Sequence, residues 1–310
     1  MQQIRVLSVN ISEQKGTIKK PVESIELTRC GVAGDAHSGL WNRQVSLLGS
    51  ESIRKFEKQA GRKITFGEFA ENITTEGLEL WKTKPLDRFL SGGLEMEVTQ
   101  IGKECHGTSC AIYRETGNCV MPKEGIFARV LHDGNLRSGD VLDYHPRIFR
   151  TLIITLSDRA FRKEYDDKSG PRVRELIGGH FQKADIPYSI ASDLIPDDPQ
   201  QLEKLLLQAK DDLVDIIFTT GGTGIGPRDF TTDVVRPLLD KEIPGIMDAI
   251  RIKYGADKPA ALLSRSVAGV MGKSLVFTLP GSVKAVNEYM SEISLSLMHM
   301  IYMLHGLDVH

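Results

Sequence analysis

The sequence has no continuous run of 18 apolar residues, which is the length a helix needs to cross a bilayer. It also lacks a strong excess of one charge, since 39 basic and 41 acidic residues give a net charge of −2. This balance offers no electrostatic basis for binding nucleic acid or an anionic membrane. Residues 1–6 lack the basic start and apolar core of a secretory signal. We therefore expect a cytoplasmic protein with neither nucleic acid nor membrane as a partner.

Cysteine is scarce. The four cysteines, Cys30, Cys105, Cys110 and Cys119, all lie in the first half of the chain. The last three follow the spacing C-x4-C-x8-C, which is not the C-x2-C spacing of common zinc sites. A cytoplasmic chain of 310 residues does not depend on disulfides. The sequence therefore predicts free thiols.

The strongest positive signal is a glycine-rich turn at residues 219–233, which read TTGGTGIGPRDFTTD. It follows an apolar run at 214–218 that is typical of a buried parallel strand, and residues 234–239 can begin a helix. Without Cβ atoms, the backbone N–H groups of such a turn can approach a phosphate closely. The turn contains neither the Gly-Lys-Ser/Thr of a Walker loop nor the Gly-x-Gly-x-x-Gly of a dinucleotide site. The candidate phosphate-binding residues are Gly221, Gly222, Thr223 and Gly224.

Acidic residues accompany this turn. Asp229 follows the glycines directly, Asp233 comes four residues later, and Asp197 lies in the segment 194–198. Carboxylate oxygens are the ligands that Mg²⁺ prefers. Two of the three have another interpretation, because Asp197 precedes Asp198-Pro199 at an ordinary helix start and Asp233 could cap a helix.

A domain boundary is predicted near residues 144–147, which divides the chain into 1–147 and 148–310. The first half has short apolar or alternating segments separated by glycine, which favours a β-barrel or sandwich. These segments are residues 5–10, 45–48, 94–101 and 127–131, with a helix near 51–56.

The second half alternates strands with helices, which predicts a doubly wound α/β sheet that is mainly parallel. Strands are expected at 151–157, 187–193, 214–219 and 274–279, and helices at 171–184, at 200–211 and at the end of the chain. In the final helix an apolar stripe at helical spacing predicts a core or subunit interface; its members are Val286, Met290, Ile293, Leu297, Met300 and Leu304.

The second half resembles the molybdopterin adenylyltransferases. The matching segments occur in the family's order across roughly residues 150–307, and are 155–159, 167–170, 194–198, 219–233, 242–245, 263–265 and 279–282. The resemblance implies a three-layer α/β domain that transfers AMP from MgATP to molybdopterin and releases pyrophosphate. It also implies a homo-oligomer, since members of the family form trimers.

The same resemblance implies a set of site residues. Asp197 and Asp229 would be catalytic and would hold Mg²⁺. Contacts to nucleotide or pterin would come from the glycine turn and from Ser157, Asp158, Asp233, Ser264, Arg265, Pro280, Gly281 and Ser282.

The first half resembles the MOSC domain, over roughly residues 3–145. The matching segments are 31–37, 43–48, 67–78 and 101–106, which runs on toward the later cysteines. The resemblance implies a β-barrel that binds the molybdenum cofactor and carries sulfur on a cysteine. Cys110 is the first candidate for that role, followed by Cys105 beside His106 and then Cys119. His37 and Arg43 are candidate contacts to phosphate or pterin.

Together the two resemblances predict a bifunctional protein of molybdenum cofactor biosynthesis. Its partners would be ATP, molybdopterin, other proteins of cofactor synthesis and a separate sulfur donor. Two alternatives remain open for the second half: a carrier or scaffold that binds molybdopterin without catalysis, and a nucleotidyltransferase acting on another phosphorylated metabolite.

Overall fold

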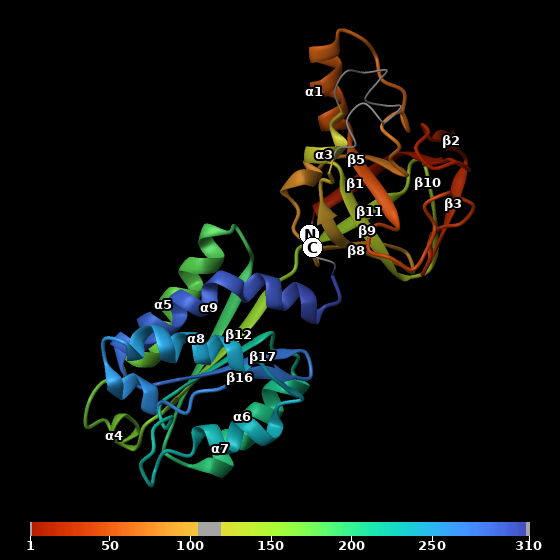
Figure 1. Cartoon of the computed structure of the whole chain (residues 1–310). Coiled ribbons are helices and arrows are strands. Elements are labelled where there is room, and N and C mark those ends of the chain that lie inside the picture. The colour runs from red at the N-terminus through yellow and green to blue at the C-terminus, as the bar shows by residue number, and fades with distance from the viewer. Residues whose placement is uncertain (1, 105–118, 308–310) are drawn as a thin grey trace. The chain divides into compact units, whose positions relative to one another are not determined.

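The computed structural model describes residues 2–104 and 119–307. The chain divides into two compact units, Met1–Arg147 and Ile148–His310, and each is treated by itself (Figure 1). Within the described residues no helix is both long and apolar enough to span a bilayer. Cys105 and Cys110 lie outside the described residues, so the structure says nothing of the predicted sulfur-carrying thiol.

The first unit contains a closed barrel of seven strands, which confirms the expected β-barrel. Strand β11 pairs with β7 at one end of the sheet and with β1 at the other, and this second pairing closes the ring. The β5–β6 pair is parallel and the other barrel pairs are antiparallel. In barrel order the strands are β11(Val141–His145), β7(Arg88–Ser91), β8(Leu94–Ile101), β9(Ile126–His132), β5(Val45–Gly49), β6(Ile73–Glu76) and β1(Gln2–Ile11).

Smaller elements surround the barrel. Strand β2 extends the sheet beside β1, and β10, β3 and β4 form a separate three-stranded sheet. Their bounds, with those of the helical segments, are β2(Lys20–Val22), β3(Ser24–Thr28), β4(Gly31–Val32), α1(Ser50–Ala60), η1(Leu80–Lys82), α3(Met121–Glu124) and β10(Gly134–Arg137). The longer strands follow the predicted segments, whereas β2, β4, β6 and β7 span two to four residues and show too few alternating positions to be recognised.

The second unit is a six-stranded sheet in the order β13-β12-β14-β17-β16-β15. The first four strands are parallel, as predicted, and the last two are antiparallel. The antiparallel edge was not expected from the sequence. The strands are β12(Phe149–Leu156), β13(Tyr188–Ile195), β14(Ile216–Thr220), β15(Lys241–Glu242), β16(Ala268–Met271) and β17(Ser274–Leu279).

Helices cover both faces of this sheet. Helices α5, α8 and α9 lie on one face and α6 and α7 on the other (Figure 1), which makes the three layers of the predicted fold. Their bounds are α4(Asp158–Phe161), α5(Ser169–Lys183), α6(Pro199–Asp211), α7(Thr231–Val235), η3(Arg236–Leu238), α8(Pro244–Gly255), η4(Pro259–Leu263) and α9(Val283–Leu304).

The ends of two neighbouring parallel strands position the site. Strand β14 ends at Thr220 and β17 ends at Leu279, and the strands are paired side by side. The N–H of Gly221 donates to the carbonyl of Leu279 at 3.0 Å. This bond holds the glycine turn beside Pro280, so both segments lie at the carboxyl edge of the sheet, where ligands of such folds bind.

The apolar stripe of α9 forms part of the core. Val286, Met290, Ile293 and Leu297 are buried, as predicted, whereas Met300 and Leu304 are only partly buried. Near the end of the helix Ile301 takes over the buried position.

Substitution of Leu297 by alanine is expected to lower the free energy of unfolding of the second unit by about 2–5 kcal/mol, because it leaves a cavity where the side chain is 0% exposed. Leu295→Ala is the matched control on the same helix, since Leu295 is 83% exposed. Urea unfolding followed by far-UV circular dichroism measures the difference. Equal stability of the two variants would contradict the packing described for α9.

Candidate functional site

A pocket of about 550 Å³ lies at the carboxyl ends of β14 and β17. This volume lies in the range of ordinary small-molecule sites. Eight of the predicted site residues line it: Gly222, Thr223, Gly224, Asp229, Ser264, Pro280, Gly281 and Ser282. Gly221 lies directly beside it, because a Cβ on Gly281 would be 3.4 Å from the Gly221 Cα.

The glycine turn admits no side chain at its first two positions. Gly221 and Gly222 have φ values of 103° and 63°, which strain residues other than glycine. A Cβ on Gly221 would lie 2.4 Å from the carbonyl oxygen of Leu156, and one on Gly222 would lie 2.4 Å from Thr231 Oγ1. Thr231 also donates from Oγ1 to the Gly221 carbonyl at 2.8 Å. The turn is therefore fixed against both β12 and the start of α7.

The carboxylate of Asp229 folds back onto the turn. Its Oδ2 accepts a hydrogen bond from the N–H of Gly226 at 2.8 Å. A Cβ on Gly224 or Gly226 would lie 2.7 or 2.9 Å from this oxygen, so both glycines leave room for it. Among the described residues, Oδ1 of Asp229 accepts no hydrogen bond. Asp229 thus orders the turn with one oxygen and has the other available to a ligand at the pocket.

Arg265 and Asp233 lie behind the turn. The guanidinium of Arg265 forms an ion pair with Asp233 and donates to the carbonyl of Asp229 at 3.3 Å. The N–H of Arg265 donates to the carbonyl of Thr223 at 2.8 Å. Neither side chain is among those that line the pocket. Their contacts therefore tie the segment before β16 to the glycine turn.

The predicted residues Ser157, Asp158 and Asp197 form a separate group at the ends of β12 and β13. The N–H of Asp197 donates to Asp158 Oδ1 at 3.0 Å, and Ser157 Oγ caps α4 by accepting from the N–H of Ala160 at 3.2 Å. None of the three lines the pocket. Asp198, rather than Asp197, caps α6, with 2.9 Å to the N–H of Gln200.

The structure does not join Asp197 and Asp229 in one metal cluster. Across residues 2–104 and 119–307, no group of three or more His, Cys, Asp or Glu side chains is placed to hold a metal ion. Mg²⁺ in phosphate-handling sites is often bound through one or two carboxylates together with substrate phosphates and water. Asp229 fits that requirement at the pocket, whereas Asp197 does not line it.

Sequence reasoning missed the wall of the pocket that α8 and α9 provide. The phenol of Tyr289 donates to Ser264 Oγ at 2.9 Å, and Lys258 pairs with Glu288 at 2.8 Å. The missed residues that line this wall include Arg251, Tyr254, Lys258, Lys284, Glu288 and Tyr289. No motif marks them, because α8 and α9 are separated by two strands and meet only in the folded unit.

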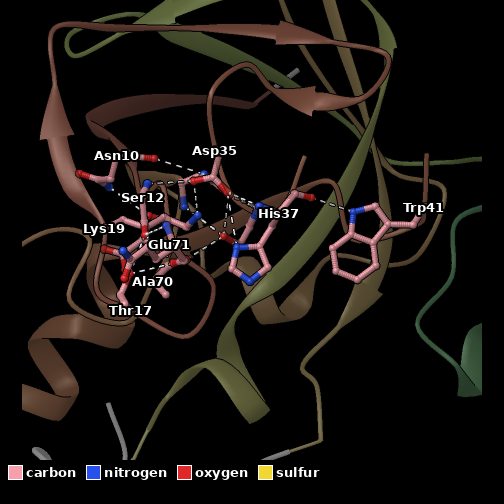
Figure 2. Close-up of polar contacts among 12 residues, drawn as sticks. Asn10, Ser12, Thr17, Lys19, Asp35, His37, Trp41, Ala70 and Glu71 are labelled. Atoms are coloured by element: carbon pink, nitrogen blue, oxygen red, sulfur yellow. Dashed lines mark hydrogen bonds and ion pairs between the residues drawn. The ribbon is translucent and has the colours of Figure 1, made fainter. Parts of the chain in front are cut away.

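The first unit holds a buried polar cluster around Asp35 (Figure 2). Lys19 and Asp35 form an ion pair with both side chains 1% exposed. The Asp35 carboxylate also accepts from Ser12 N–H at 3.1 Å, from Asn72 Nδ2 at 3.1 Å and from His37 N–H at 3.0 Å. Burial acts to raise the pKa of Asp35, but the hydrogen bonds from His37 and Lys19 outweigh it and hold that pKa well below its ordinary value.

A small pocket of about 150 Å³ opens beside this cluster. His37, Arg43 and Lys103 line it, and none of its lining residues within 2–104 and 119–307 is a carboxylate. His37 Nδ1 lies 3.5 Å from Asp35, and the carbonyl of His37 accepts from Trp41 Nε1 at 2.9 Å. The Arg43 guanidinium lies over the Trp41 ring at 5.2 Å. The pocket is therefore lined by cationic and aromatic groups, as the binding of an anionic ligand requires.

Glu71 is a second buried carboxylate in this unit. Its Oε1 accepts from the N–H of Gly67 at 2.6 Å and from Thr74 Oγ1 at 3.0 Å, whereas Oε2 is buried without a partner among the described residues. Burial raises the pKa of Glu71 to about 7 against the effect of these hydrogen bonds. Burial likewise lowers the pKa of Lys19, which Asp35 only partly offsets.

Of the cysteines in the described residues, Cys30 is exposed and Cys119 is partly buried. Cys119 packs against the small apolar cluster that contains Met121 and Phe127. A sulfur-carrying role for Cys119, the third candidate, stays a prediction.

Substitution of Gly221 by alanine is expected to distort the turn, because the added Cβ meets the Leu156 carbonyl and the backbone has a positive φ. Loss of about 1–3 kcal/mol of unfolding free energy and of ligand binding at the pocket should follow. The control is Gly179→Ala, in the interior of α5 with nothing within 4 Å; it is expected to stabilise by up to about 1 kcal/mol. Thermal unfolding of both variants checks that the first is less stable than wild type and the second more stable.

The raised pKa of Glu71 makes the first unit less stable as pH rises. Between its ordinary pKa of 4.5 and about 7, the folded protein holds a proton that the unfolded chain releases, so the free energy of unfolding falls by about 3 kcal/mol over that window. Glu71→Gln should remove this slope, and Glu23→Gln, on an exposed residue of the same unit, should retain it. Urea unfolding at several pH values, read from Trp41 and Trp81 fluorescence, measures both. If the pH dependence of the unfolding free energy were unchanged in Glu71→Gln, Glu71 would not be its source.

Comparison with known families accounts for both units. Residues 152–299 match the family described as "Probable molybdopterin binding domain". Residues 34–143 match the family described as "MOSC domain". The two matches lie in separate units of the structure.

Relatives of the second unit have related names. Molybdenum cofactor biosynthesis protein B of Bacillus cereus is 38% identical over 165 residues, which are 52% of this chain and 93% of that protein. Molybdopterin adenylyltransferase of Helicobacter pylori is 31% identical over 142 residues, covering 46% of this chain and 79% of that protein. Molybdenum cofactor synthesis protein cinnamon of Drosophila melanogaster is 35% identical over 51% of this chain, but this chain spans only 26% of that longer protein.

Among solved structures, the molybdopterin biosynthesis enzyme MoaB of Thermus thermophilus is 38% identical and is covered over 98% of its length, with 51% of this chain aligned and a TM-score of 0.46. Two relatives, from B. cereus and H. pylori, are each at least 30% identical and are covered over most of their length. The chain therefore belongs to the molybdenum cofactor biosynthesis proteins of the MoaB and MogA type, and it carries a MOSC domain before its molybdopterin-binding domain.

Proposed function

We propose that the second unit is a molybdopterin adenylyltransferase, which transfers AMP from MgATP to molybdopterin and releases pyrophosphate. The observation that carries this proposal is the single pocket where the glycine turn, Asp229 and the start of α9 meet. Phosphate recognition, a carboxylate and a helix N-terminus are brought together there, as a reaction at phosphorus requires. The relative from H. pylori supports the proposal by its name.

The chain's own groups would act mainly by positioning and by neutralising charge. The backbone N–H groups of Gly222, Thr223 and Gly224 would face the phosphates, since the two glycines have no Cβ, whereas the N–H of Gly221 already donates to the Leu279 carbonyl. The first turn of α9, which follows Pro280 and Gly281, would add its unpaired N–H groups. Ser282 Oγ already accepts from the N–H of Ala285 at 3.2 Å, so it orders that turn.

Asp229 is the residue that would hold Mg²⁺ in this pocket, through the oxygen that the turn does not use. When bound, the ion would neutralise charge on the substrate phosphates. Asp197 would take part from the far side of the sheet edge, and its N–H bond to Asp158 fixes the backbone there. Both roles are proposals drawn from the family and from the chemistry of carboxylates.

We propose further that the MOSC unit binds the cofactor or its precursor at the pocket lined by His37, Arg43 and Lys103. The cationic lining supports an anionic ligand, and molybdopterin is a phosphate ester. A role for Cys110 in carrying sulfur from a separate donor protein remains part of this proposal. Covalent fusion would give an intermediate released by one unit a high effective concentration at the other.

The test is pyrophosphate release from MgATP in the presence of molybdopterin. Asp229→Asn is expected to lower the rate at least about 100-fold, because the amide keeps the hydrogen bond to Gly226 but loses the charge at the pocket. The control is Asp198→Asn, since asparagine caps a helix as well as aspartate does and Asp198 lies outside the pocket.

Two other outcomes decide between the candidate functions. A wild-type protein that binds molybdopterin and releases no pyrophosphate would favour the non-catalytic carrier. Release that does not need molybdopterin but needs another phosphorylated metabolite would favour a different nucleotidyltransferase.

A further inference from the structure

Two lysines stand next to each other on the wall of the pocket that the sequence did not reveal. Lys258 follows α8, and Lys284 is the second residue of α9, and both line the pocket. Their ammonium groups are near enough to perturb each other: the pKa of Lys284 is lowered, and its largest cause is the Lys258 side chain. The pKa of Lys258 is raised, first by its hydrogen bond to Glu288.

Only one lysine of the pair has an ion-pair partner among the described residues. Glu288 Oε1 lies 2.8 Å from Lys258 Nζ, and Asp257 is a second carboxylate that acts on Lys258. In the part of the chain that the structure describes, Lys284 forms no ion pair of its own. Lys284 also lies in the first turn of a 22-residue helix, where the backbone already favours negative charge. A cation in that position is unfavourable unless an anion comes to it.

Both lysines line one cavity, so an anion bound in that cavity would meet them there. The same cavity is bounded elsewhere by the glycine turn, with Gly222 and Gly224, and by Asp229. Arg251, the other cation on this wall, is already engaged with the Asp248 carboxylate at 2.6 Å and with the carbonyl of Ser266 at 3.0 Å. Among the described residues, Lys284 is therefore the cation of this wall without an ion pair, and Lys258 beside it has one, with Glu288.

We propose that Lys258 and Lys284 form a subsite for a phosphate group carried by a substrate of this pocket, and that Glu288 positions Lys258 for it. This inference rests on the proposed function only in that phosphorylated substrates occupy the pocket. The phosphate has two sources with the same chemistry: the terminal phosphates of ATP, which leave as pyrophosphate, and the phosphate ester of the pterin.

The chain offers a matched control for this proposal. Lys253 also bridges α8 to α9, through an ion pair with Glu292 at 2.7 Å, one turn along α9 from Glu288. Lys253 does not line the pocket. Replacing Lys253 by glutamine removes a similar helix-to-helix ion pair without removing a charge from the cavity.

The experiment measures binding of pyrophosphate, MgATP, AMP and molybdopterin to the full chain by isothermal titration calorimetry. Lys258→Gln and Lys284→Gln are each expected to weaken the ligand whose phosphate occupies the subsite by about 10-fold, the size of a lost charge-assisted hydrogen bond. Lys253→Gln should bind as wild type does. Glu288→Gln should keep the lysine charges and remain within a few-fold of wild type.

The ligands distinguish the two sources. Weaker pyrophosphate and MgATP with unchanged AMP would assign the subsite to the terminal phosphates. Weaker molybdopterin alone would assign it to the pterin phosphate, and either result supports the proposal. Unchanged affinity for all four in both lysine variants, or an equal loss in Lys253→Gln, would overturn it. Lysine-dependent pyrophosphate binding without adenylyl transfer would retain the subsite and refute the enzyme, and a wild type that binds none of the four would overturn both.

Discussion

The backbone at Gly221 has no space for a side chain, and the arrangement of the main pocket depends on that constraint. Gly221 directly follows β14 and lies between the Leu156 carbonyl of β12 and the Leu279 carbonyl of β17. A larger residue would push the turn away from both. Because the turn stays close, Gly281 can lie against Gly221, and the start of α9 reaches the same cavity as the glycine N–H groups.

The first unit depends on a different constraint, which is the saturation of a buried charge. Asp35 has its oxygens occupied by Lys19, by N–H groups of Ser12 and Asn72, and by the N–H of His37 in its own loop. Taking a carboxylate out of water is unfavourable unless it is paired and hydrogen-bonded in this way. The cluster therefore fixes the loop that carries His37 and leaves Arg43 directed to the small pocket rather than to Asp35.

Much of the second unit could be predicted because its strands are local apolar runs. The four parallel strands and the stripe of α9 have a periodicity that the sequence shows directly. The antiparallel edge could not be found this way, since β15 has two residues and its pairing with β16 depends on tertiary contacts. In the first unit the barrel class followed from strand spacing, but closure through β1 and β11 joins opposite ends of that unit's sequence.

In the candidate site, too, the residues of local motifs could be predicted and those brought together by folding could not. Glycine and aspartate in the turn are found from sequence because they act through the local backbone, and eight of the predicted residues do line one pocket. Asp197 follows β13, whereas the pocket lies at the ends of β14 and β17, so Asp197 does not line the cavity although its segment resembles the family's. Lys258 and Lys284 had no signal at all, because their significance comes only from their approach to each other.

The two pockets differ in whether their charges are compensated. Around Asp35 nearly every hydrogen-bonding group of the carboxylate is used, and the charge serves the structure of the loop. At the main pocket an oxygen of Asp229 and the ammonium of Lys284 have no partner within the described chain. Uncompensated charges at a surface cavity weaken the fold slightly, and a ligand with complementary charge removes that penalty on binding. The residues with unused charge, rather than the most buried ones, are therefore the ones expected to contact substrate.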